Sequence, residues 1–182
     1  MRFLLTLLLF LFCCSGNEKQ VVDLLYNNNL RTNRLLLQGS DALKQHNFMQ
    51  ALALADSADK YAVQKADIHF FKGRVYSELG RFAEAEQAYK NALKAVPGYR
   101  GARNNLGNNA YRQQNFSQAV DYYIQEVTQN QAPIPLRALG RAFVELGKTD
   151  SARTCFQKAI DLDMNYAAAY FNLAQLEEDE GN

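Results

Sequence analysis

The chain has 182 residues, a length typical of one domain, and 48% of them are hydrophobic, which is enough to form a buried core. Its formal net charge is +1, so no overall positive field attracts nucleic acid, and we expect no nucleic-acid partner. Only three prolines, no Trp and abundant Ala, Leu, Gln, Asn, Lys and Glu favour helices over strands.

The first predicted element is an apolar leader. Residues 3–12 are almost wholly apolar and follow the positively charged Arg2. A run of about ten apolar residues is too short to span a bilayer, which takes roughly 20. A short apolar run behind a positive charge is typical of a signal peptide, which we expect at residues 1–13.

The end of this leader resembles the signal of bacterial lipoproteins, in which a Leu and then a small residue precede the lipidated Cys. Cys14 fits that pattern better than Cys13, because Cys13 is small whereas Phe12 is bulky. The resemblance implies a lipid anchor on Cys14 and export to the cell envelope, at the outer membrane or in the periplasm. Residues 14–31 then form a lipidated tether with one or two helical turns. The alternative is a plain secretory leader whose cysteines are incidental.

The rest of the chain contains an internal repeat. Gly39, Gly73, Gly107 and Gly140 recur at intervals of 34, 34 and 33 residues, and Ala174 follows after another 34. Three further markers keep this register: Ala51, Ala85, Ala119 and Ala152; Phe48, Phe82 and Phe116; and Tyr89, Tyr123 and Phe156. Each unit therefore reads as two amphipathic helices around a short turn, with small residues where the helices cross closely.

These markers resemble the tetratricopeptide repeat. The unit at 66–99 carries the fullest set: Gly73, Tyr76, Gly80, Phe82, Ala85, Tyr89, Ala92 and Pro97. The resemblance implies an all-α fold, a right-handed alpha-solenoid of stacked helix-turn-helix repeats with a concave side. The domain at 32–180 is expected to contain repeats at about 32–65, 66–99, 100–132 and 133–166, then a capping helix at 167–180.

The resemblance also implies that the first helix of each unit lines a groove that faces a partner. The residues carried over to that groove are Phe70, Arg74, Asn104, Asn108, Tyr111, Arg137 and Arg141. Arg forks suit carboxylates and Asn side chains can hydrogen-bond a peptide backbone, and no Asp or Glu is expected to face them. The set resembles the carboxylate clamp of chaperone-binding members of the family, which favours an acidic or C-terminal peptide. The alternative is a solvated polar face.

No catalytic motif, phosphate loop or metal-ligand spacing is found, so we expect neither an enzyme nor a cofactor or metal site. The acidic run at residues 177–180 could bind a cation, but a solvated helix end explains it more simply. The sequence thus predicts a membrane-anchored, non-enzymatic scaffold that binds a protein or peptide in its groove. The alternative is a self-associating structural component of an envelope assembly, such as a pilus, secretion or cell-wall complex.

Overall fold

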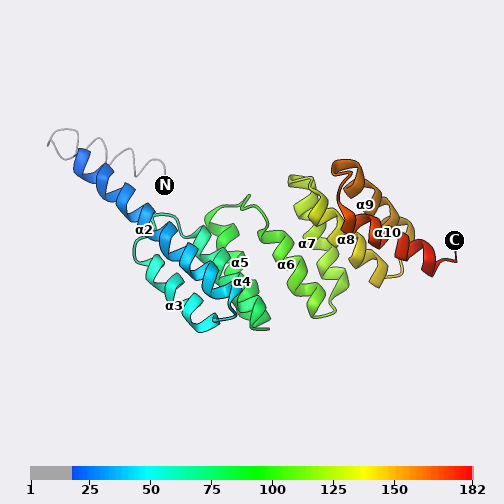
Figure 1. Ribbon diagram of the computed structural model, residues 1–182, viewed down its shortest axis with the longest axis horizontal. Helices are drawn as coiled ribbons and strands as arrows, with labels where there is room; N and C mark the ends of the chain where they lie inside the picture. The colour runs from blue at the N-terminus through cyan, green and yellow to red at the C-terminus, as the bar shows by residue number, and fades with distance from the viewer. Residues whose placement is uncertain (1–17, 182) are drawn as a thin grey trace.

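The computed structural model describes residues 18–181, which form nine α-helices and no strand. In chain order these are α2 (Glu18–Lys44), α3 (Phe48–Asp59), α4 (Ala66–Glu78), α5 (Phe82–Ala95), α6 (Ala102–Arg112), α7 (Phe116–Gln129), α8 (Pro133–Glu145), α9 (Thr149–Leu162) and α10 (Ala167–Asp179). The hairpins follow one another along the long axis, with α2 at one end and α10 at the other (Figure 1). The predicted all-α class and the stacked hairpins are confirmed.

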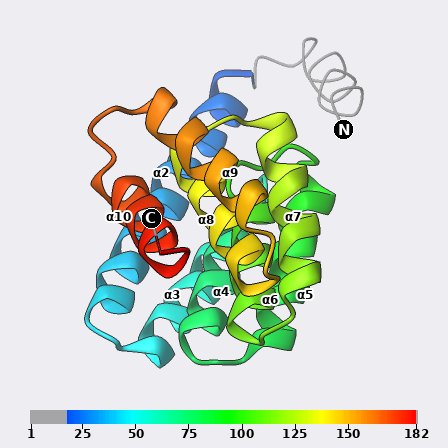
Figure 2. The same ribbon diagram turned by 90° about the vertical axis from the view of Figure 1, so that its right-hand side faces the viewer.

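The hairpins form two layers. Each second helix packs against its own first helix and against the first helix of the next unit. The first helices, α2, α4, α6, α8 and α10, also contact one another in series. They therefore make a continuous inner layer, and Figure 2 looks along it from the C-terminal end, with α10 nearest the viewer.

The repeated glycines lie where two helices approach most closely. A Cβ placed on Gly73 would lie 2.6 Å from a ring carbon of Tyr89, and one on Gly107 would lie 2.5 Å from Tyr123. Gly140 stands in the same relation to Phe156, also at 2.5 Å. These three rings are among the largest fully buried side chains of the described residues, so they cannot move aside. The glycines and aromatic residues that recur in the sequence are thus the residues that pack against one another between the helices.

The turns inside the hairpins repeat as well. His46, Gly80, Gln114 and Gly147 each hold the left-handed backbone conformation, with φ of 58°, 71°, 61° and 67°. Glycine adopts this conformation at no steric cost, whereas a side chain there is strained. The units therefore share one turn geometry even where the sequence lacks the glycine.

The N-terminal part of the domain differs from the prediction. Residues 18–31 are not a tether with one or two turns but the first half of a continuous helix, α2. This segment has no Pro or Gly, so nothing in it interrupts the helix. Arg31 stacks over the Tyr61 ring at 5.5 Å, which ties this part of the helix to the first hairpin. The signal peptide and Cys14 lie outside the described residues.

Glu126, which replaces the small residue usual at its place in the repeat, has a clear role. Its side chain is 3% exposed, and its Oε1 accepts a hydrogen bond from the Gly101 amide at 3.2 Å. Gly101 precedes the first residue of α6, so the carboxylate meets the positive end of that helix dipole. Pro133 is the first residue of α8, a position at which its missing N–H costs no helix hydrogen bond.

Candidate peptide-binding groove

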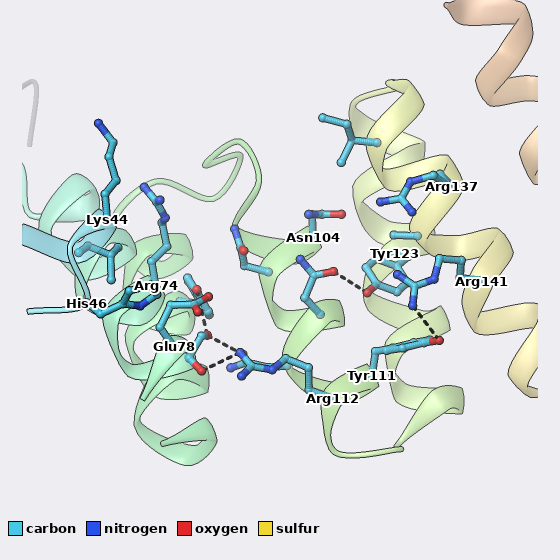
Figure 3. Close-up of a pocket in the computed structure, with 18 residues that line it drawn as sticks. Lys44, His46, Arg74, Glu78, Asn104, Tyr111, Arg112, Tyr123, Arg137 and Arg141 are labelled. Carbon is cyan, nitrogen blue, oxygen red and sulfur yellow. Dashed lines mark hydrogen bonds between the residues drawn. The ribbon is translucent and has the colours of Figure 1, made fainter. Parts of the chain in front are cut away.

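The inner layer of helices encloses a cavity of about 560 Å³. Six of the seven predicted groove residues line it: Arg74, Asn104, Asn108, Tyr111, Arg137 and Arg141. Arg74 comes from α4, the Asn and Tyr side chains from α6, and the other two Arg side chains from α8 (Figure 3). The solenoid therefore brings together residues that lie up to two units apart in the sequence.

Phe70 is the predicted residue that does not line this cavity. Its ring packs instead into the seam between the second and third units, 5.7 Å from the Tyr89 ring and 5.0 Å from the Tyr99 ring. Tyr99 is held there because its hydroxyl donates to Asp67 at 2.5 Å. The structure thus places the half-buried Phe70 ring against Tyr99 of the connection before α6 and not in this cavity.

The cavity carries a clear excess of positive charge. Its lining includes five cationic side chains, Lys44, Arg74, Arg112, Arg137 and Arg141, against one carboxylate, Glu78. The expectation that no acidic side chain faces the groove was therefore wrong, since Glu78 follows Arg74 by one turn of α4 and shares its face. The balance remains strongly positive and favours an anionic ligand.

Both α8 arginines are oriented by tyrosine side chains. Arg137 donates through Nε to the Tyr166 hydroxyl at 2.9 Å and lies 5.9 Å from the centre of that ring. Arg141 donates to the Tyr111 hydroxyl at 3.3 Å and lies 4.9 Å above its ring. An Arg whose orientation is already fixed loses less conformational entropy when it binds a carboxylate. These contacts preorganise the two guanidinium groups.

Arg112 has a structural role. It donates to the Ser77 carbonyl at 2.7 Å and stacks over the Phe82 ring at 5.0 Å, so it joins α6 to the second hairpin. The Ser77 hydroxyl in turn donates to Asn109 Oδ1 at 2.6 Å and lies 3.2 Å from the Tyr89 hydroxyl. These contacts form a buried polar network at one side of the cavity.

Two buried tyrosines complete the lining and stay neutral. Burial raises the pKa of Tyr89 to about 12 and raises that of Tyr123 still further. The Tyr123 hydroxyl donates to Asn108 Oδ1 at 2.7 Å. Both phenols therefore act as neutral hydrogen-bonding groups at physiological pH and add no negative charge.

Two amide atoms in this lining have no hydrogen-bond partner. They are Oδ1 of Asn104, an acceptor, and Nδ2 of Asn109, a donor. Asn109 is 3% exposed, so its free N–H group is buried. A buried polar group without a partner is unfavourable by about 1–3 kcal/mol, and a ligand that pairs with it removes that penalty. One donor and one acceptor match the N–H and C=O groups of a peptide.

The groove continues toward the C-terminal end. A second cavity of about 600 Å³ lies between α8 and α10. Its lining includes Arg137 and Arg141, which it shares with the first cavity, and Phe171. Arg137 also donates to Asn172 Oδ1 at 3.4 Å, across the boundary between the two units. The two arginines thus stand where the cavities meet.

Several lining residues were not singled out from the sequence. His46, Glu78, Asn109 and Arg112 belong to this group. Asn109 and Arg112 carry no repeat signal, because their roles come from contacts with Ser77 in the preceding unit. Only the packed hairpins bring these side chains together.

The described residues contain no group of three or more His, Cys, Asp or Glu side chains that could hold a metal ion. Among the same residues, none of the helices has the length and apolar character needed to cross a membrane.

A stack of antiparallel helical hairpins with glycine–aromatic seams defines a repeat solenoid. Family models of the tetratricopeptide repeat match residues 36–100 and 140–179. The chain is therefore built from tetratricopeptide repeats and forms the predicted right-handed alpha-solenoid. Proteins with this fold typically act as protein-interaction scaffolds. No curated protein matches the chain by sequence.

Solved structures support this fold. PilF of Pseudomonas aeruginosa superposes with a TM-score of 0.77 at 20% identity, covering 85% of this chain and 71% of that one. MamA of Desulfovibrio magneticus RS-1 gives 0.70 at 16% identity, covering 83% and 86%. The first TPR of Spaghetti (RPAP3), bound to the HSP90 peptide SRMEEVD, gives 0.62 at 22% identity, covering 66% and 97%. At these identities the likeness concerns the fold alone.

Proposed function

We propose that this protein is a non-enzymatic adaptor that binds an acidic peptide segment in its concave groove. The observation that carries the proposal is the lining of the groove, which combines an excess of cationic side chains with two unpartnered amide atoms. The cations attract carboxylates, and the amides pair with the peptide backbone. The relative from Spaghetti (RPAP3) supports the chemistry, since its bound peptide, SRMEEVD, is acidic and ends in a carboxylate.

Arg137 and Arg141 are the proposed anchors. They lie one helical turn apart on α8 and are both held by tyrosines. Both line the point where the two cavities meet, so an extended peptide that follows the groove passes them. A charge-assisted hydrogen bond contributes about 1.5–3 kcal/mol, so these side chains dominate the affinity.

Fluorescence anisotropy with a labelled SRMEEVD peptide tests the proposal directly. The chain from Ser15 onward suits this assay, because every core residue of the described part lies between Ala42 and Leu176. We expect measurable binding that weakens at least roughly tenfold in the variant carrying both Arg137→Ala and Arg141→Ala. Binding should also weaken when the acidic residues of the peptide are replaced by amides.

The matched control removes two positive charges outside the groove. Lys94 and Lys158 are exposed on the second helices α5 and α9, so the variant carrying Lys94→Ala and Lys158→Ala has the same net charge as the double Arg variant. It should bind the peptide as the unaltered chain does. Equal affinity of the double Arg variant and the unaltered chain would contradict the groove proposal.

Membrane attachment through Cys14 is the second part of the proposal and stands on the sequence alone. Labelling with a fatty-acid analogue in bacterial cells should mark the chain and should fail after Cys14→Ser. The control is Cys13→Ser, which keeps the proposed acceptor. Equal labelling of the Cys14 variant and the unaltered chain would show that Cys14 is not the anchor, and would favour the plain secretory leader.

The alternative function, self-association into an envelope structure, concerns other surfaces of the molecule. Its support comes from apolar side chains exposed on α2 and α10, at the two ends of the solenoid. The exposed apolar side chains of α2 line neither cavity, whereas Phe171 of α10 lines the second one. Self-association through α10 and peptide binding therefore share part of one surface.

A further inference from the structure

Helix α10 holds the position of a first helix in the stack, and one of its faces is left uncovered. Ala174 on α10 lies 34 residues after Gly140 and so holds the register of the repeated small residue. Gly140 is covered by the Phe156 ring from its own second helix, but Ala174 is exposed. Tyr170 on the same helix is 47% exposed. In the described part of the chain, no second helix covers this face of α10.

At the other end, the first half of α2 carries the pattern of a second helix. In α9, Phe156 is the ring that covers Gly140. The residues four before it, one before it and four after it are apolar, namely Ala152, Cys155 and Ile160. In α2 the same positions around Tyr26 are also apolar: Val22, Leu25 and Leu30. Tyr26, Val22 and Leu30 are 64%, 55% and 46% exposed, so this surface has no partner.

One copy of the chain cannot bring these two surfaces together. The free half of α2 projects from one end of the solenoid, and α10 lies at the opposite end (Figure 1). The intervening hairpins are packed in series, so the ends cannot fold onto each other. The occupant of each surface must therefore come from another molecule.

We infer that the free half of α2 in one copy docks on α10 of a second copy and acts as its missing second helix. Tyr26 then lies against Ala174 in the register of Phe156 and Gly140, with the two helices farther apart to make room for the Ala174 methyl group. The docked helix extends the α9–α10 packing by one helix, so the new contact is continuous with the last seam of the solenoid. This inference concerns the ends of the molecule and does not depend on peptide binding in the groove.

The charges at this contact are complementary. In the α4–α5 hairpin, the first helix ends at Glu78, five residues after Gly73, and the second begins at Phe82, seven residues before Tyr89. The same register counted from Ala174 and Tyr26 places Asp179 opposite Lys19. Both are exposed, and Asp179 also meets the positive end of the α2 dipole. The pair therefore favours the antiparallel orientation that a hairpin requires.

The contact joins different surfaces of the two copies, so it is heterologous and assembles chains or rings rather than closed symmetric dimers. Sedimentation velocity of the chain from Ser15 onward should show association that grows with protein concentration. Tyr26→Asp and Ala174→Glu each alter an exposed side chain, so the fold is retained and can be checked by circular dichroism. Each should weaken association at least roughly tenfold.

A mixing experiment separates this arrangement from other contacts. The Tyr26→Asp chain keeps an intact α10, and the Ala174→Glu chain keeps an intact α2. Each variant alone should stay monomeric, whereas an equimolar mixture should form a one-to-one dimer. Association of the Ala174→Glu chain by itself would indicate pairing of two α2 helices and would overturn the inference.

The charge pair provides an independent check. Lys19→Glu should weaken association roughly two- to fivefold, the range for an exposed ion pair, and Asp179→Lys in the same chain should restore it. Ile124→Asp, at an exposed apolar position on α7 away from both ends, is the control and should change nothing. An unaltered chain that remains monomeric at all concentrations tested would overturn the inference.

Discussion

Replacing Gly107 by Ala tests the packing that sets the whole stack. Alanine is the better helix former by about 1 kcal/mol, so this change stabilises an exposed helix. In α6, however, the added Cβ would lie 2.5 Å from Cε1, 2.6 Å from Cδ1 and 2.9 Å from Cζ of Tyr123. These separations are far below van der Waals contact, so the helix or the ring must shift.

The ring has little freedom to move. Tyr123 is 2% exposed, and its hydroxyl is held by the Asn108 side chain at 2.7 Å. Overpacking of such a site costs up to about 3 kcal/mol. Subtracting the propensity gain of about 1 kcal/mol leaves an expected loss of about 2 kcal/mol in the free energy of unfolding.

Urea unfolding followed by far-UV circular dichroism measures this loss. The control is the same substitution in a Tyr123→Leu background, which removes the ring that the methyl group meets. There Gly107→Ala should have no destabilising effect, because only the gain in helix propensity remains. A Gly107→Ala chain that is more stable than the unaltered one would refute the packing argument.

Three further substitutions or measurements test other parts of the structure. Glu126→Ala removes the acceptor for the Gly101 amide and should lower stability by about 1–3 kcal/mol in urea unfolding, whereas Glu126→Gln keeps an acceptor and should lose less. Gln114→Gly relieves the left-handed strain at φ 61° and should raise stability by about 1 kcal/mol, while Gly80→Ala should lower it. Burial raises the pKa of Cys155 to about 11, so its thiol should react with a disulfide reagent at neutral pH only as fast as the protein opens. A Glu126→Ala chain of unchanged stability, a destabilised Gln114→Gly chain, or rapid labelling of Cys155 in the folded protein would contradict these expectations.

The repeat made most of the fold predictable. The recurrence of a glycine and of an aromatic residue in one register predicted both the hairpins and their contacts, because close helix crossings leave room only for the smallest residues. The expected unit at 66–99 corresponds to the hairpin of α4 and α5. The length of α2 was not predicted, since its first half is helical without any repeat partner in its own chain.

The groove was predictable at the positions that the repeat directs inward. The repeat spacing alone was enough to predict four residues that line the cavity: Arg74, Asn104, Arg137 and Arg141. Phe70 shares that register, but its ring packs against Tyr99 in the connection before α6. This connection depends on Tyr99 and on the positive φ of Gly101, neither of which belongs to the repeat pattern.

The electrostatics of the groove were less predictable. Glu78 and Arg112 line the cavity although neither was assigned to it from the sequence, because the angle between hairpins decides which side chains of a turn face inward. The unpartnered atoms of Asn104 and Asn109 emerge only when every neighbouring donor and acceptor is placed. The repeat spacing predicts which positions face the groove, but the hydrogen-bond partners of their side chains can be assigned only from the packed structure.

Titration of an acidic peptide into the isotopically labelled chain, observed through the side-chain amide signals of Asn104 and Asn109 by NMR, addresses the groove most directly. Binding along the inner layer should shift both signals in proportion to the bound fraction, together with the backbone signals around Arg141. Shifts confined to the second helices, or no shift at saturating peptide, would show that the concave side is not where the partner binds.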